Sequence, residues 1–143
     1  DGPQLHFAHA NGFPPETYRV LVGELQLNYS VVSMFARPLW SKAPASTLGD
    51  WSELAGDLRQ ELDTRGLRGI ATVGHSLGAV CSLLAAAEDP ELFSAIVAID
   101  PLVLTGTKAR LWGVAKKVGQ AGQLGLVKGA LRRRETWPGS KAP

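Results

Sequence analysis

A serine flanked by glycines, in the segment Gly74-His75-Ser76-Leu77-Gly78, is the strongest chemical signal in the sequence. The apolar run 70–73 precedes it directly, and an alanine- and leucine-rich stretch, 79–88, follows it. This context predicts a sharp strand-to-helix turn that lifts the Ser76 side chain above a sheet, and such a turn requires flanking residues with almost no side chain. The helix start would offer amides and a positive dipole end to an oxyanion. We therefore interpret Ser76 as a nucleophile on an elbow; the alternative is an ordinary glycine-flanked turn.

A second segment, His9-Ala10-Asn11-Gly12-Phe13-Pro14, follows the apolar run 5–8, as a strand that enters a glycine- and proline-rich loop. With these two motifs the sequence resembles the α/β-hydrolase fold family over about residues 4–104. The loop looks like the His-Gly-type oxyanion loop of bacterial hydrolases, with two residues inserted between His and Gly. The resemblance implies a partial α/β-hydrolase fold, with a parallel sheet and helices on both of its faces.

The resemblance also implies roles for individual residues. Ser76 would attack an acyl carbonyl, and the backbone amide of Leu77 would be one oxyanion donor. Phe13 or Asn11 would supply the second amide. A serine at the elbow argues against the dehalogenase and epoxide-hydrolase branches, which use a carboxylate. The expected protein is a serine hydrolase of the ester-cleaving class (EC 3.1) that forms an acyl-enzyme with a small acyl substrate and needs no cofactor.

The partners of the serine are missing from the expected positions. A serine hydroxyl needs an imidazole base, which a carboxylate normally orients, and the resemblance implies the order Ser, acid, His. The three histidines all precede the elbow: they are His6, His9 and His75. The sequence therefore predicts an incomplete portion of a hydrolase, inactive alone, whose acid and histidine lie in the missing carboxyl-terminal portion. The alternatives are a non-catalytic fragment or pseudoenzyme that binds a ligand or partner chain, and an acyltransferase or thioesterase.

Four further polar residues lie on or near these motifs. We expect His9 to hold the loop through backbone hydrogen bonds, with a substrate contact or an improvised base as alternatives. His75 is expected to pack beside the elbow and is a second candidate for a substrate contact. His6 is expected to be a core histidine with its hydrogen bonds satisfied. Asp100 is expected to cap the turn before Pro101, with the triad acid as the alternative.

The elements that must position these residues alternate between strands and helices. Strands are predicted over 5–8, 29–35, 70–73 and 95–99, and helices over 15–27, 51–65 and 79–88. Asp50 and Glu53 fit a capping box, and Gly66 fits a helix C-cap. An apolar stripe is formed by Trp51, Leu54, Ala55, Leu58 and Leu62. This alternation predicts a parallel sheet whose carboxyl edge gathers the loop, the elbow and Asp100.

Composition excludes several classes of protein. The chain has 143 residues, of which 45% are hydrophobic, and no apolar run approaches the length of about 18 residues that spans a bilayer. The single cysteine, Cys81, cannot form an intrachain disulfide, which favours the cytoplasm. No Cys/His cluster has metal-ligand spacing, and no glycine-rich phosphate loop is present.

Charge separates the chain into two parts. Residues 1–100 carry a net charge of −6, and residues 101–143 carry +8. We expect residues 1–104 to form the core and residues 105–143, which contain several glycines, to begin a mobile helical lid. Contact of this basic segment with a membrane is a weaker alternative, and nucleic-acid binding is weaker still because no aromatic residues are interleaved with its charges.

Overall fold

The computed structural model describes residues 2–39, 50–103 and Gly106, and the elements below belong to the unit Asp1–Val103. The sheet is formed by β1 (Gln4–Ala8), β2 (Ser30–Ser33), β3 (Ile70–His75) and β4 (Phe93–Ile99). The helices are α1 (Arg19–Gln26), α2 (Trp51–Thr64) and α3 (Leu77–Glu88), with short 3-10 helices η1 (Pro15–Tyr18) and η2 (Arg37–Leu39). The predicted order of strands and helices is confirmed. The predicted lid falls outside the described residues, apart from Gly106.

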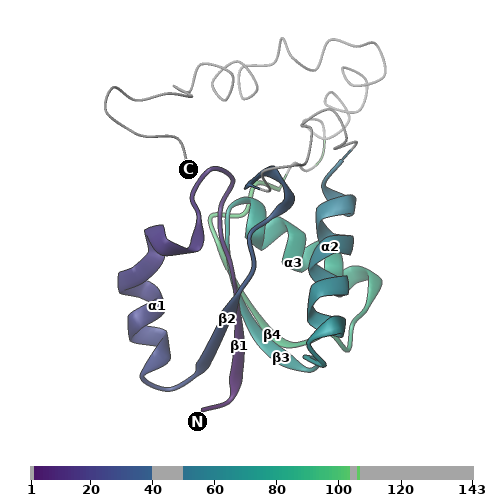
Figure 1. Ribbon diagram of the computed structural model, residues 1–143. Helices are drawn as coiled ribbons and strands as arrows, with labels where there is room; N and C mark the ends of the chain where they lie inside the picture. Colours follow the sequence, from purple (N-terminus) through teal and green to yellow (C-terminus); the bar gives the residue numbers. More distant parts are fainter. Residues whose placement is uncertain (1, 40–49, 104–105, 107–143) are drawn as a thin grey trace, which may run out of the picture. The chain divides into compact units, whose positions relative to one another are not determined.

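All strand pairs are parallel, in the order β2-β1-β3-β4. Figure 1 shows α1 on one face of this sheet and α2 and α3 on the other. β1 and β3 lie next to each other, with Ala8 opposite Gly74, so their carboxyl ends meet at one edge. The loop after β1 and the elbow after β3 therefore begin side by side. The predicted fold class, a partial α/β-hydrolase fold, is confirmed.

The two faces of the sheet bury separate clusters of apolar side chains. The α1 face buries Leu5, Phe7 and Val73, against which partly buried residues of α1 pack. The larger cluster, on the α2 and α3 face, comprises Leu54, Ala55, Leu58, Leu62, Ile70, Leu77, Cys81, Ala85, Leu92 and Phe93.

Four of the five stripe residues of α2 are therefore buried, but the expectation was wrong for Trp51, which is 39% exposed. Trp51 is the first residue of the helix, and helical side chains tilt toward the amino terminus, so its ring extends past the end of the packed surface.

Asp50 caps the amino terminus of α2, because its carboxylate accepts a hydrogen bond of 2.8 Å from the amide of Ser52. The Glu53 carboxylate accepts from Arg37 at 3.1 Å. Arg37 also makes a two-pronged contact with Asp57, at 2.8 and 2.5 Å. This cluster ties η2, the segment after β2, to α2. Gly66 follows the helix with φ +67°, which agrees with the predicted C-cap.

The outer strand β4 differs from the expectation of a sheet covered on both faces. Of its seven residues only Phe93 is buried, while Val97 is 54% exposed and Ile99 is 38% exposed. β4 pairs with β3 alone among the described strands, so its other edge has no partner within residues 2–39 and 50–103. An apolar strand with a free edge is an unusual surface for a soluble domain, because it presents unpaired backbone groups beside hydrophobic side chains.

Candidate active site

The backbone of Ser76 makes the sharp turn that the sequence predicts. Its φ is 50° and its ψ is −112°, a conformation that L-residues other than glycine rarely adopt. Two backbone hydrogen bonds hold it there: the Ser76 amide donates to the carbonyl of Ile99 at 2.9 Å, and its carbonyl accepts from Val80 at 3.1 Å. The Ser76 side chain is half-buried, and its hydroxyl has no hydrogen bond to any of the described residues. A strained turn that presents an uncommitted hydroxyl is the arrangement that a nucleophile requires.

The glycines on either side of Ser76 are required by close backbone contacts. A Cβ at Gly74 would lie 2.6 Å from the Cα of Ala79, at the start of α3. A Cβ at Gly78 would lie 2.2 Å from the carbonyl oxygen of Ala8 and 2.7 Å from that of His9. The first contact lets helix and strand meet at the elbow. The second brings the amino terminus of α3 against the beginning of the loop after β1, where an oxyanion donor is expected.

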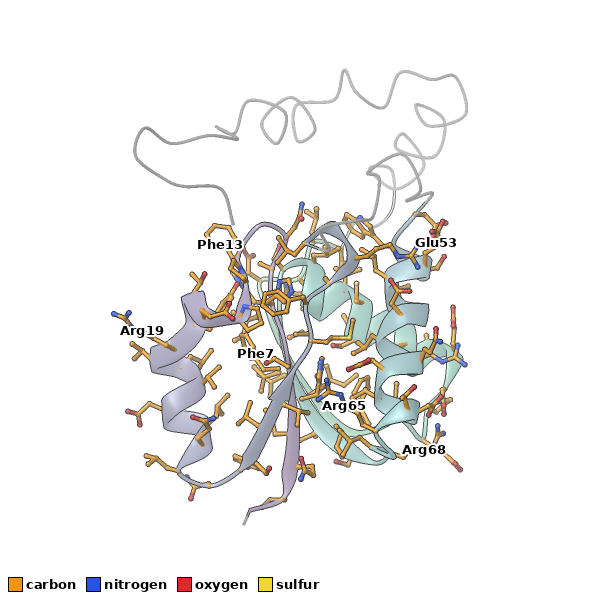
Figure 2. The ribbon with its side chains drawn as sticks, in the orientation of Figure 1. Phe7, Phe13, Arg19, Glu53, Arg65 and Arg68 are labelled. Carbon is orange, nitrogen blue, oxygen red and sulfur yellow. The ribbon has the colours of Figure 1, made fainter. Side chains whose placement is uncertain are left out.

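The loop after β1 turns tightly between Ala10 and Phe13. The Phe13 amide donates to the Ala10 carbonyl at 3.1 Å, and Gly12 has φ +74°, which favours glycine. The Phe13 amide is therefore used within the turn, and its side chain is exposed at the end of the loop (Figure 2). The Asn11 amide has no hydrogen-bond partner in the part of the chain that the structure describes. Of the two amides expected as the second donor, that of Asn11 is the available one.

His9 is almost fully buried, and both of its ring nitrogens are engaged. Nδ1 donates to the carbonyl of Ala10 at 2.8 Å, and Nε2 accepts from the amide of Ala36 at 2.9 Å. This pattern requires the neutral imidazole with its proton on Nδ1, because a carbonyl can only accept and an amide can only donate. The ring therefore links the loop after β1 to the segment after β2, as the loop-holding interpretation expects.

No sequence motif singles out Tyr18, which lies within the segment 15–27 predicted to be helical. The Tyr18 hydroxyl accepts from the Ala10 amide at 3.2 Å and lies 2.8 Å from Nδ1 of His75. Its ring packs against Phe7, with centroids 4.7 Å apart, and against His75, with centroids 5.8 Å apart. His75 thus packs beside the elbow, as expected. A tyrosine whose ring faces the core needs a hydrogen-bond partner for its hydroxyl, and only this requirement could have indicated from the sequence that Tyr18 makes such contacts.

His6 lies in the core as expected, but its hydrogen bonds are not all satisfied. Nδ1 contacts the Thr72 hydroxyl at 3.3 Å, Thr72 contacts Ser82 at 3.5 Å, and Ser82 donates to the Gly78 carbonyl at 2.9 Å. Nε2 has no hydrogen-bond partner within the described residues. Burial, together with the positive charge of Arg65, lowers the pKa of His6 to about 4. The side chains of His6, Thr72 and Ser82 therefore form a chain of neutral polar contacts that ends at the Gly78 carbonyl, next to the elbow.

Asp100 is the second non-glycine residue with positive φ in the described part of the chain, at 45°. His75 pairs with Ile99 in the sheet, so Ser76 and Asp100 each follow directly after paired residues. The Asp100 side chain is exposed and makes no hydrogen bond to a described residue, including the expected turn cap. The expectation that the Asp100 side chain caps the turn before Pro101 is therefore wrong, and its positive φ is one that Asp tolerates better than most residues.

Comparison with known proteins agrees with this geometry. Residues 38–138 match the alpha/beta hydrolase fold family, which is more than half of the chain. The chain belongs to the alpha/beta hydrolase fold family. The matched range includes the elbow and begins after the His9–Pro14 loop. No curated protein sequence matches the chain.

Solved structures at low sequence identity share this fold. An alpha/beta hydrolase from the metagenome of lagoon sediments at Mar Chica, Morocco, is 22% identical with a TM-score of 0.62, over 92% of this chain and 57% of that one. A hydrolase from Pseudomonas aeruginosa is 21% identical with a TM-score of 0.67, over 84% and 45%. A structure reported with carboxylesterases of Nitrososphaera gargenis is 20% identical with a TM-score of 0.64, over 84% and 46%. The chain thus spans about half the length of these hydrolases.

A small cavity lies beside the elbow among the described residues. Its volume is about 30 Å³, which is room for a water molecule. Leu77, His9, Arg37 and Cys81 are among the residues that line it. Burial raises the pKa of the Cys81 thiol to about 12, which disfavours the nucleophilic thiolate form.

Two kinds of site are absent from residues 2–39 and 50–103 of this chain. No group of three or more His, Cys, Asp or Glu side chains lies close enough together there to hold a metal ion. None of the helices there has the length and hydropathy needed to cross a bilayer.

Proposed function

We propose that this α/β hydrolase is a serine hydrolase that cleaves carboxylic esters or related acyl substrates through an acyl-enzyme on Ser76. The observation that carries the proposal is the backbone of Ser76, held at φ 50° between β3 and α3 with its hydroxyl uncommitted among the described residues. Strain of this kind costs about 1–3 kcal/mol and persists where the surrounding structure maintains it for function. The presence of carboxylesterases among the structures of similar fold supports the choice of substrate class.

In the proposed reaction, Ser76 Oγ forms a bond to the acyl carbon while its proton passes to a base. The carbonyl oxygen becomes an oxyanion, which the amides of Leu77 and Asn11 would stabilise. Leu77 is the first residue of α3, where amides have no partner within the helix. Each such donor contributes about 3 kcal/mol to the transition state in comparable sites. The tetrahedral intermediate then expels the alcohol, which takes the proton from the base, and water releases the acid from Ser76.

The base and the acid of this reaction are proposed to come from a further portion of the same fold. His6 and His9 are buried, and His9 uses both of its ring nitrogens for backbone contacts. β4 has a free edge among the described strands and exposes Val97 and Ile99, a surface suited to another strand. The chain covers only 57% and 45% of two structures of similar fold. Asp100, which directly follows Ile99, the sheet partner of His75, is the alternative acid within the chain.

A fluorophosphonate probe tests the nucleophile, applied to this chain and to the full product of its gene. We expect labelling of the full product, loss of labelling in Ser76→Ala, and unchanged labelling in Ser94→Ala, which alters an exposed serine of β4. The chain alone should hydrolyse p-nitrophenyl acetate no faster than its Ser76→Ala variant. If neither the chain nor the full product is labelled, the protein is a pseudoenzyme. Faster turnover of an acyl thioester than of the matched oxygen ester would identify a thioesterase.

A further inference from the structure

We propose that Tyr18 is a positioning residue, whose hydroxyl fixes the oxyanion loop relative to the nucleophile elbow. The inference rests on the proposed function, because it assigns Tyr18 a part in orienting the donor amide of Asn11 toward the reaction at Ser76. Tyr18 lies at the end of η1, outside both motifs. Its contacts nevertheless fall one residue before each functional position, since Ala10 precedes Asn11 and His75 precedes Ser76.

The hydrogen-bonding capacity of the hydroxyl matches its two neighbours. It accepts from the Ala10 amide at 3.2 Å, and it can give its own proton to Nδ1 of His75 at 2.8 Å. A tyrosine hydroxyl has one proton to donate and lone pairs to accept with, so both contacts form at once. One oxygen atom thereby joins the segments that leave the carboxyl ends of β1 and β3.

The peptide bond that carries the proposed donor is held on its other side. The carbonyl of Ala10 accepts from Nδ1 of His9 at 2.8 Å and from the Phe13 amide at 3.1 Å. In a trans peptide the N–H points opposite to the carbonyl, so fixing the Ala10 carbonyl also fixes the direction of the Asn11 N–H. Tyr18 fixes the preceding peptide through the Ala10 amide. Both peptide planes that flank the Ala10 Cα are therefore anchored.

The ring of Tyr18 keeps the hydroxyl in this place. It packs against the fully buried Phe7 at an interplanar angle of 58° and meets His75 nearly edge-on, at 74°. Because β1 carries Phe7 and β3 carries His75, movement of Tyr18 would disturb contacts to both strands. The substitution Tyr18→Phe retains these ring contacts and removes only the oxygen. It is therefore the cleanest variant for the test, with Tyr29→Phe as the matched control, since Tyr29 is 37% exposed at the surface.

The first measurement is the rate of fluorophosphonate labelling and ester hydrolysis by the full gene product. Tyr18→Phe should lower kcat and the labelling rate about 10-fold with KM little changed, because an oxyanion donor acts in the transition state and not in substrate binding. Tyr29→Phe should keep the wild-type rates. His75→Gln, which retains an acceptor for the hydroxyl, should lose less activity than His75→Leu. Wild-type kcat in Tyr18→Phe would overturn the inference.

The second measurement does not depend on activity. In Tyr18→Phe the Ala10 amide should exchange its hydrogen faster, and the 15N resonance of His75 Nδ1 should shift, while Tyr29→Phe changes neither. Unchanged exchange at Ala10 would overturn the inference even if kcat fell, because the loss would then have another cause. If wild-type Ser76 is not labelled at all, the proposed function itself is refuted, and the catalytic role of Tyr18 falls with it; the exchange result then reports only a structural contact.

Discussion

Replacement of His6 by glutamine should make the stability of the protein less sensitive to acid. His6 is 2% exposed, and its pKa is lowered from 6.5 to about 4, first by burial and then by the charge of Arg65. Between these values the unfolded chain binds a proton at His6 and the folded chain does not, so the free energy of unfolding falls as the pH falls from about 6.5 to 4. The full loss is about 3 kcal/mol, and about 2 kcal/mol of it falls between pH 7 and pH 5.

Urea titration at pH 7 and pH 5 measures this effect. A loss of about 2 kcal/mol lowers the midpoint of unfolding by about 1 M urea, on top of any change caused by other groups. The glutamine of His6→Gln keeps a polar group near Thr72 but does not titrate. Between pH 7 and pH 5, the urea midpoint of this variant should therefore fall by about 1 M less than that of the wild type. The carboxylates titrate equally in both proteins and cancel in the comparison. Equal shifts in the two proteins would show that His6 takes up its proton without unfolding, and the reasoning from burial would be wrong.

Three further predictions concern the elbow and its surroundings. Gly78→Ala should lower the free energy of unfolding by about 2 kcal/mol, because its Cβ would meet the Ala8 carbonyl oxygen. Gly56→Ala, in α2, should raise the free energy of unfolding slightly, because no atom lies within 4 Å of the new Cβ. Thermal unfolding compares the two variants, and equal stability would refute the contact at Gly78. Ser76→Gly should be about 1 kcal/mol more stable than Ser76→Ala, because glycine adopts positive φ without strain, and identical urea midpoints would contradict strain at this position. Cys81 should react with iodoacetamide at pH 8 only after the protein is unfolded in urea, because its thiol is buried. Mass spectrometry measures the labelling, and rapid labelling of the native chain would refute this burial.

Local signals account for the elements that the sequence predicts well. The apolar run before Gly74 and the alanine-rich stretch after Gly78 predict β3, the turn and α3, because each depends on neighbours within a few residues. Asp50 predicts the start of α2 for the same reason, since its carboxylate caps an amide two residues away. The environment of Trp51 was less predictable, because periodicity locates the buried side of a helix and not where along the helix the packing ends.

The sequence by itself determined the order of the elements, the parallel sheet and the nucleophile Ser76 as a candidate, since all three follow from pattern and spacing. Only the tertiary structure decided that the Asn11 amide, and not the Phe13 amide, is available in the loop after β1, and which side chains hold that loop in place. The contacts of Tyr18 with His75 and of His9 with Ala36 join residues 57 and 27 positions apart in the chain. Such pairs meet only after the strands have paired, and hydrogen-bond geometry depends on differences of a few tenths of an ångström that residue types do not specify.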